Sequence, residues 1–499
     1  MLKRRTVLTT AALGALSSIA LPQAATAQTR GKNAIVLAMT LEPTGLDPTV
    51  SAASSIGEVT LYNIYETLTH IGADGNVTPL LAESWDISPD LKTYTFRLRK
   101  GVKFQNGEPF DAKAVKFSFE RAGGEKSTNK DKRTFANIGV QVIDDHTVVL
   151  LNKEIDPDFP FVLGQATAII VEPKSVDTNA SAPVGTGPYK LTTYNKGTSI
   201  VLDAWDGFRN PGAIKIKRAT FRFISDPAAQ VAAMMSGDVD VFPRVAAART
   251  LGQFKADPRF QIVISGSRAK TIVAFNNKKK PLDDVRVRRA ISMAIDRKAF
   301  IEGAADGFGV PIGSHYVPGA LGYVDTTGVN AFNLDKAKAL LTEAGIKTPL
   351  ELNVTLPPTP YARQGGEVLV AQLAKVGITA KLQNVEWAQW LSGTYGNKNY
   401  DMTIISHVEP FDLGNYAKAD YYWGYESKAF TTLFDKIKNT GNTQERAKLL
   451  GDAQRLLAND AANAFMYQPQ WITVAKKGVK GLWKDMPIFV NDLTGLSWA

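Results

Sequence analysis

Apolar and polar residues alternate along residues 94–99 (YTFRLR), and this pattern predicts a half-buried β-strand. The pair Asn106-Gly107 follows as a turn signal. Asp111 then provides the N-cap of a helix that is expected to run to about Arg121. A strand, a turn and a capped helix are therefore expected in quick succession.

Glycine separates a predicted helix from a predicted strand at three places in the chain. The three units are 228–236, Gly237 and 239–242; 335–344, Gly345 and 351–356; and 367–376, Gly377 and 378–382. Glycine is the residue expected just past a helix end. Helices that alternate with strands in this way indicate α/β layers.

Two further segments have helical periodicity. One helix is expected to begin at Asp283 or Asp284 and to keep its apolar spacing as far as Ile301. A long amphipathic helix is expected over 444–459. The predicted fold class is α/β, with some antiparallel sheet around 90–150.

Residues 406–425 (SHVEPFDLGNYAKADYYWGY) have neither a helical nor a strand period. Six of the twenty are aromatic (Phe, Trp or Tyr), whereas these residues make up 9% of the whole chain. The segment also contains His407, one of only four histidines in the chain. The aromatic residues are Phe411, Tyr416, Tyr421, Tyr422, Trp423 and Tyr425, and the acids are Glu409, Asp412 and Asp420. The reason for so much amphipathic and acidic surface in an irregular segment has to come from the rest of the chain.

The N-terminus has the features of an export signal. Residues 3–5 (KRR) are basic, residues 7–21 carry no charge, and residues 25–27 (ATA) fit a small-x-small cleavage site. The uncharged run is shorter than the roughly 20 residues needed to span a bilayer. We expect a signal peptide at 1–27 and a mature protein in the periplasm. The paired arginines suit the twin-arginine route, and the general secretory route is the alternative.

Composition narrows the class of protein. The chain has no cysteine, so an exported protein of this size is expected to depend on hydrophobic cores and not on disulfides. The net charge is +10 over 499 residues, and the basic clusters, such as 278–280, are short. Such clusters are typical of solvated surface, so nucleic acid is not an expected partner.

Motifs for catalysis and metal binding are missing. Residues 185–189 (GTGPY) begin like a dinucleotide-binding loop, but proline follows the second glycine at once and the third glycine is absent. There is no Walker loop, no G-x-S-x-G elbow and no H-E-x-x-H pair. The histidines are His70, His146, His315 and His407. Because they lack paired-ligand spacing and thiolate partners, no protein-only metal site, no cofactor and no enzymatic activity are expected.

Several stretches in a fixed order resemble a known family. They are residues 42–48 (EPTGLDP), 65–90, 94–121, 184–191 (VGTGPYKL), 236–242 (SGDVDVF), 276–297, 336–346 and 453–461. On these the chain resembles the family 5 extracellular solute-binding proteins of ABC importers, which include dipeptide-, oligopeptide- and nickel-binding proteins. The resemblance spans nearly the whole mature chain.

The resemblance implies a two-lobed periplasmic binding protein fold of type II, in a three-domain variant with a discontinuous domain I. The implied domain I is 28–50 with 183–272 and 480–499, domain II is 51–182, and domain III is 273–479. The chain would cross between the lobes near 273–277 and 474–478. Closure of such a hinge requires backbone changes at few residues.

The resemblance also assigns residues 406–425 to a ligand-facing part of domain III. In peptide-binding members an aspartate close after a tryptophan pairs with the α-ammonium group of the ligand. Here His407 stands about where the tryptophan would be, and Glu409 or Asp412 stands in for the aspartate. A buried carboxylate in a closed cleft suits a cation.

Aromatic residues supply the remaining candidates. Tyr421 and Trp423 would provide apolar contact and attract cations, or would pack in the core of domain III. Trp387 and Trp390 have the same two interpretations. Leu46 belongs to a loop that lies at the cleft edge in the family.

The expected function is that of a periplasmic substrate-binding component of an ABC importer. It would bind a short peptide or peptide-like cationic solute between the lobes, as a monomer, and deliver it to the inner-membrane permease with its cytoplasmic ATPase. The alternatives are an opine, an oligosaccharide or a metal chelate as ligand or, in another class, a secreted hydrolase.

Overall fold

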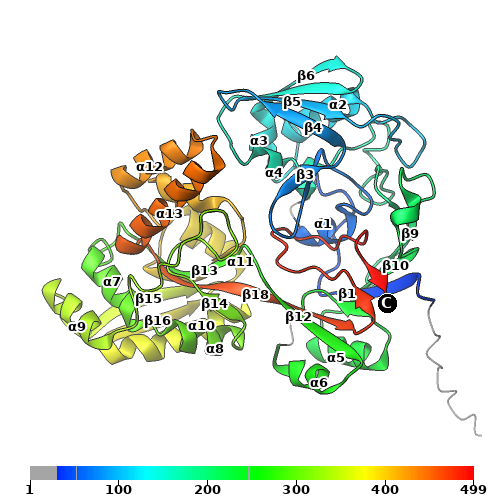
Figure 1. The fold of residues 1–499 in the computed structure, drawn as a ribbon. Helices are drawn as coiled ribbons and strands as arrows, with labels where there is room; N and C mark the ends of the chain where they lie inside the picture. The colour runs from blue at the N-terminus through cyan, green and yellow to red at the C-terminus, as the bar shows by residue number, and fades with distance from the viewer. Residues whose placement is uncertain (1–30, 52, 246–247) are drawn as a thin grey trace, which may run out of the picture.

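The computed structural model describes residues 31–499 except 52, 246 and 247, so the predicted signal peptide lies outside the described residues. The described chain forms two lobes that stand side by side (Figure 1). Helices and sheets are layered in both, which confirms the predicted α/β class. Within the described part of the chain, no helix is long and apolar enough to cross a membrane.

One twelve-stranded sheet extends through both lobes in the order β16-β15-β17-β13-β18-β11-β1-β10-β9-β8, with β12 and β14 also paired to β18. Its strands are β1 (Ala34–Met39), β8 (Tyr189–Asn195), β9 (Ser199–Ala204), β10 (Arg218–Phe223), β11 (Val241–Phe242), β12 (Phe260–Gly266), β13 (Lys270–Phe275), β14 (Gly309–Pro311), β15 (Leu350–Leu356), β16 (Ile378–Asn384), β17 (Met402–His407) and β18 (Ala464–Lys476).

Strand β18 joins the lobes. Its first part pairs with β13 and β14, and its second part pairs with β12 and β11. Beside it, β12 ends at Gly266 and β13 begins at Lys270, so the chain passes from one lobe to the other between these two residues. Figure 1 shows β18 passing across the gap between the lobes. The exact limits of the three predicted domains remain a prediction.

The lobe that holds both ends of the described chain is built on β1, which is parallel to β10 and β11. Helices α5 (Pro227–Ser236) and α6 (Leu251–Ala256) pack beside this part of the sheet (Figure 1). The C-terminal tail returns here through β19 (Val479–Lys480) and β20 (Ser497–Trp498). The indole N–H of Trp498 donates to the carbonyl oxygen of Ala34, 2.9 Å away.

A four-stranded antiparallel sheet extends the same lobe, with the order β4 (Ala82–Ile87), β5 (Thr93–Leu98), β7 (Thr147–Asn152) and β6 (Ile138–Asp144). Its apolar face packs on α2 (Ala112–Gly123). Asp111 caps α2 by accepting from the backbone N–H groups of Lys113 and Ala114. The strand and the capped helix predicted here are confirmed.

The other lobe contains parallel β15, β16 and β17 with helices packed against them (Figure 1). Its longer helices are α7 (Val285–Ala294), α8 (Arg297–Ala305), α9 (Leu334–Glu343), α10 (Pro360–Leu373), α12 (Lys428–Lys438) and α13 (Thr443–Asn459). Gly237, Gly345 and Gly377 all have positive φ at the ends of helical segments, as the three predicted units require.

The helix expected from Asp284 through Ile301 is not continuous, so that prediction was wrong. The α7 segment ends at Ala294, and Asp296 starts α8 by accepting from the N–H groups of Lys298 and Ala299. Ile295 is the C-cap of α7 and Asp296 is the N-cap of α8, while the apolar spacing persists across both residues. Periodicity alone therefore hides the break.

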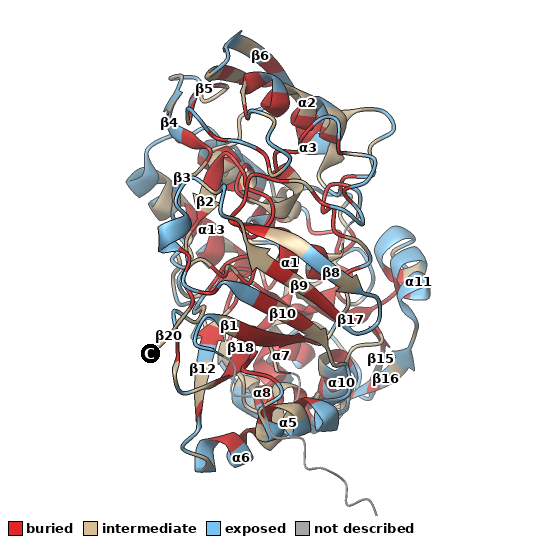
Figure 2. Ribbon diagram, turned by 90° about the vertical axis from the view of Figure 1, so that its right-hand side faces the viewer, coloured by how far each residue is buried: buried red, intermediate tan, exposed pale blue. Residues whose placement is uncertain are grey.

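Short elements complete the described chain. They are α1 (Ser54–Thr60), β2 (Thr69–Ile71), β3 (Val77–Pro79), α3 (Lys132–Ala136), α4 (Phe159–Val162), α11 (Trp387–Gln389), a π-helical segment (Trp390–Gly396) and several 3₁₀ turns, of which Asp412–Ala417 is the longest. In Figure 2 the central strands are largely buried, whereas α11 and α6 are exposed at the edges of the molecule.

Candidate functional site between the lobes

Residues 406–425 begin at the end of β17 and then leave the sheet. His407 is the last residue of β17 and lies opposite Lys270 in the antiparallel pair with β13. The chain continues through an exposed bend that includes Glu409, and the following 3₁₀ turn carries Asp412 back into the interior. The two candidate acids are thus in opposite environments, since Glu409 is exposed and Asp412 is buried.

Asp412 is held by internal partners. The Lys270 ammonium lies 2.5 Å from its Oδ1 and also donates to the carbonyl oxygen of Glu409 at 2.5 Å. His315 Nε2 lies 2.8 Å from Asp412 Oδ2, and His407 Nδ1 lies 3.3 Å from the same oxygen. The carboxylate that the sequence offered as an anchor for a ligand cation already has a lysine of its own.

The neighbouring hydrogen bonds assign the direction of this network. Asn463 donates to the Tyr416 hydroxyl at 2.8 Å, and that hydroxyl lies 3.1 Å from His315 Nδ1. Tyr416 therefore donates to Nδ1, and the proton of His315 is on Nε2, where it points at Asp412. The hydrogen bonds thus run from Asn463 through Tyr416 and His315 and end at the Asp412 carboxylate.

Burial and charge set the protonation states of the network. Burial lowers the pKa of His315 to about 4, although the Asp412 carboxylate acts in the opposite direction. Burial would raise the pKa of Asp412, but the hydrogen bonds and positive charge around it hold that pKa well below its usual range. Near neutral pH the network is thus an ionised carboxylate, an ammonium and a neutral imidazole.

One ligand atom from each of His315, His407 and Asp412 lies within 4.8 Å of the others, a spacing at which three such groups could hold a metal ion. No sequence motif predicts this cluster, since the two histidines are far apart in the chain. Lys270 neutralises the carboxylate, and a metal would have to displace the His315 proton that points at it. The residues present fit a hydrogen-bonded charge network better than a cation site.

Most of the aromatic residues in the segment belong to the core. Tyr416, Tyr422, Trp423 and Tyr425 are buried in one hydrophobic cluster, and Tyr421 packs on it while half-buried. Trp390 joins the same cluster, with its indole N–H donating to Thr403 Oγ1 at 3.0 Å. The structure therefore places Trp423 and Trp390 behind the surface. Trp423 lies close to His407, with ring centroids 5.3 Å apart.

Trp387 differs, because 43% of it is exposed. Leu391 and Tyr395 are also exposed and follow at intervals of four residues, so the three share one face of the helical segment from α11 onward. Leu46 lies apart from these residues, in the core of the other lobe, and is fully buried. Of the eight candidates, Glu409 and Trp387 are exposed, Tyr421 is intermediate, and the rest are buried.

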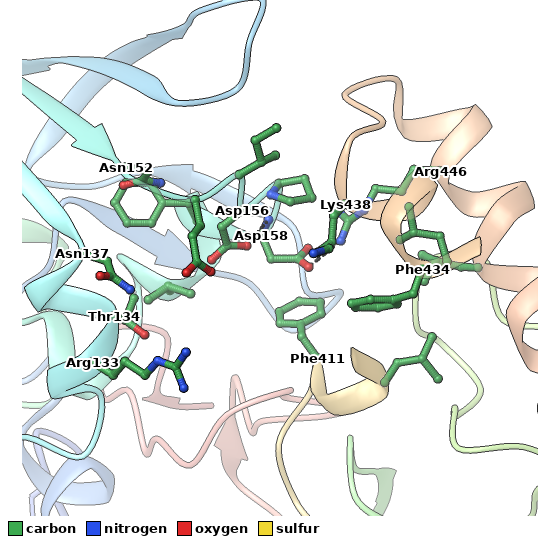
Figure 3. A pocket seen from close by; sticks show the side chains of 18 of the residues that line it. Arg133, Thr134, Asn137, Asn152, Asp156, Asp158, Phe411, Phe434, Lys438 and Arg446 are labelled. Carbon is green, nitrogen blue, oxygen red and sulfur yellow. Dashed lines mark hydrogen bonds and ion pairs between the residues drawn. The ribbon is translucent and has the colours of Figure 1, made fainter. Parts of the chain in front are cut away.

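A cavity of about 450 Å³ lies between the lobes (Figure 3). One wall comes from α3, the end of β7 and the loop that leads into α4. The opposite wall comes from α12, α13 and the bend with Phe411. Phe411 reaches across to Phe161, with ring centroids 4.7 Å apart at an interplanar angle of 90°.

Charged groups from both lobes line this cavity. Arg446 on α13 forms an ion pair with Asp158 on the opposite wall, and both side chains are largely buried. Asp156 lies beside them, and burial together with the nearby Asp158 charge raises the pKa of Asp156 to about 6. Figure 3 shows Asp156, Asp158 and Arg446 directed into the space between the lobes.

Sequence reasoning missed both acids and the arginine. Asp158 and Arg446 are 288 residues apart and belong to no local motif. The only available signal was the concentration of Asp and Pro at residues 156–160 (DPDFP), which a sequence alone presents as an ordinary loop.

Comparison with known proteins places this architecture. The family described as bacterial extracellular solute-binding proteins, family 5 (middle region) matches residues 76–430. The chain belongs to this family. Its members are solute-binding proteins, and they form the periplasmic or extracellular binding components of importers. The predicted family, fold and class of function are therefore confirmed.

Relatives cover nearly the whole chain. The dipeptide-binding protein of Escherichia coli K12 is 28% identical over 93% of this chain and 94% of its own. Heme-binding protein A of Haemophilus influenzae is 28% identical over 90% of this chain and 89% of its own. The solved structure of the Helicobacter pylori protein DppA with the peptide STSA has a TM-score of 0.77 and 25% identity, over 93% of this chain and 98% of its own. The family 5 fold thus extends across the described lobes.

Proposed function

We propose that this protein is the periplasmic substrate-binding component of an ABC importer and that it captures a short peptide or peptide-like solute between its lobes. The observation that carries the proposal is the interlobe cavity, which has charged and aromatic groups on both walls. Peptides are zwitterions with apolar side chains, so such a lining offers partners for each part. The dipeptide-binding and STSA-binding relatives support the same class of solute.

The eight candidate residues divide by exposure. We infer that Trp387, Glu409 and the half-exposed Tyr421 contact the solute or the rim of its site. His407, Asp412, Trp390 and Trp423 support this surface from behind, and Leu46 supports the other lobe. Buried residues still matter for binding, because they fix the geometry of the surface that the solute meets.

The protein would act without chemical turnover, as a monomer, and would hand its solute to permease subunits driven by a cytoplasmic ATPase. Export by the predicted signal peptide, through the twin-arginine or the secretory route, completes the proposal. Solute would shift an equilibrium between open and closed lobes, since only the closed form contacts it from both sides.

Native mass spectrometry of the purified protein tests the proposal. A co-purifying molecule with the mass of a short peptide supports it. The mass of an opine, an oligosaccharide or a metal chelate would instead assign the ligand to that class. Added solute should also reduce the radius of gyration in small-angle scattering. A constant radius at saturation would contradict closure of the lobes, and hydrolysis of peptides or esters would contradict a pure binding function.

A further inference from the structure

Two acids of the interlobe cavity, Glu154 and Asp156, have no ion pair among the described residues. Glu154 is exposed, so the partly buried acid without a cation is Asp156. Its Oδ1 accepts from the backbone N–H of Asp158 at 3.0 Å. The neighbouring Asp158 carboxylate, in contrast, already has the guanidinium of Arg446. A partly buried carboxylate without a cation is unfavourable until a positive group joins it.

The cations around the cavity have other partners or lie in solvent. Lys438 pairs with Asp435 at 3.2 Å on the same helix, and Lys418 donates to Asn415 at 2.9 Å. Arg133 is exposed on α3, where water screens its charge. Of the charged groups in the cavity lining, Asp156 therefore has the strongest unmet demand, and it is for a positive charge.

The surroundings of Asp156 suit an organic cation. The rings of Phe159, Phe411 and Phe434 line the same cavity, and aromatic faces attract ammonium and guanidinium groups. Asn152 lines it too, is about nine-tenths buried, and has a side-chain oxygen without a hydrogen-bond partner. That oxygen is an acceptor for a further N–H group.

We propose that Asp156 anchors the positively charged group of the solute, an organic ammonium or guanidinium, inside the interlobe cavity. This inference rests on the proposed function for the location of the site and adds the charge of the ligand. It assigns the cation to the wall formed by the loop before α4 and not to Asp412, where Lys270 is already bound. The group would come from a peptide N-terminus or from a basic side chain.

The anchor makes binding depend on pH. Charged and titratable groups surround Asp156 on every element packed against it. They are Asp158 and Glu154 on its own loop, Tyr94 on β5, Arg133 on α3, Tyr316 in the loop after β14, Lys418 just after the 3₁₀ turn, Lys438 on α12 and Arg446 on α13. Burial and Asp158 raise the pKa of Asp156 to about 6. The carboxylate loses its charge below that pH, so a cationic solute should bind roughly tenfold more weakly at pH 5 than at pH 7.

Calorimetry with two sets of probes tests the assignment. The first set is trialanine, trilysine and their N-acetylated forms, and the second is butylammonium and methylguanidinium with acetate as the anionic control. Asp156→Asn should weaken binding of the cationic probes by thirtyfold or more, because it removes one partner of a desolvated charge pair. Asp177→Asn, which changes an exposed acid of the same lobe outside the cavity, should bind within threefold of the parent.

The two sets separate the inference from the proposed function. If Asp156→Asn binds peptides within threefold of the parent at both pH 5 and pH 7, the inference is wrong and the proposed function stands. Binding of simple cations without any peptide binding, lost in Asp156→Asn, supports the inference and overturns the peptide proposal. If no cation of either set binds the parent protein, the inference is wrong. If N-acetylation abolishes binding of trialanine, the α-ammonium group supplies the charge in that peptide. If N-acetylated trilysine still binds, a lysine side chain can supply it instead.

Discussion

The ammonium group of Lys270 lies 2.5 Å from the Asp412 carboxylate, and both side chains are almost completely buried. Lys270 belongs to the first strand of one lobe after the crossing, and Asp412 belongs to the irregular segment that faces the other lobe. The pair therefore anchors the candidate binding surface to the strand next to the hinge. Its main effect should be on folding stability and on the position of that segment.

Breaking this pair should destabilise the protein strongly. Lys270→Met or Asp412→Asn leaves one buried charge without its partner, which typically costs about 3–5 kcal/mol. The double variant Lys270→Met with Asp412→Leu should lose less than the sum of the single changes, since no charge is left buried. Urea unfolding measures the three free energies. A loss below about 1 kcal/mol in Asp412→Asn would contradict the pairing.

The contribution of His315 to folding stability should fall as the pH is lowered from about 7 to about 4. The folded His315 has a pKa of about 4, whereas an unfolded histidine has one near 6.5, so between these values the unfolded chain binds more protons. Protonation thus favours the unfolded state, by roughly 3 kcal/mol over the whole window. Asp412 acts in the same direction below about pH 4, because its pKa is lowered in the folded protein.

His315→Gln is the matched comparison for this pH effect. Asp156, with a raised pKa, contributes with the opposite sign in both proteins and cancels in the difference. The unfolding free energy of the variant should depend less on pH between 7 and 4 than that of the parent. Parallel curves would show that His315 is not buried in its neutral form.

The ion pair of Asp158 with Arg446 should favour the closed arrangement of the lobes. Arg446→Gln leaves Asp158 next to Asp156 without a cation, a change that typically costs about 2–5 kcal/mol for a largely buried pair. Solute-free protein should then open, with a larger radius of gyration in small-angle scattering. Arg455→Gln alters an exposed arginine of the same helix and should leave the radius unchanged. Equal scattering curves for the parent and Arg446→Gln would contradict a role of this ion pair in holding the lobes closed.

Glu409→Gln should change affinity by less than about fivefold and leave the melting temperature as it is. The side chain is exposed, and exposed charge pairs contribute only about 0–1 kcal/mol. Calorimetry with the co-purified solute or the tripeptides measures this. A loss of thirtyfold or more would return the anchoring role to Glu409.

Local signals explain what the sequence could predict. Asp111 and Gly237 act on backbone groups within a few residues, so a cap or a helix end is visible in a short window. The same reasoning failed near Asp296, where a cap interrupts an unbroken apolar spacing. The family resemblance supplied the two-lobed fold, which no local pattern contains.

The candidate site is built from residues far apart in the chain, so only part of it could be predicted from the sequence. Asp412 was a candidate, but its partners Lys270 and His315 come from segments 142 and 97 residues away. Its burial and pairing are tertiary properties, and no spacing encodes them. Asp156 and Arg446 acquire meaning only when the two lobes face each other across the cavity.

Strand β18 has a consequence for how the protein is made. It lies near the end of the chain, yet it completes the sheet of both lobes. A ribosome releases the N-terminal residues first, so the part of this sheet in each lobe stays incomplete until residues 464–476 have emerged. The lobes should therefore finish folding together and late, since such distant strand pairing is slow to form. A truncation before residue 464 would therefore deprive both lobes of a central strand at once.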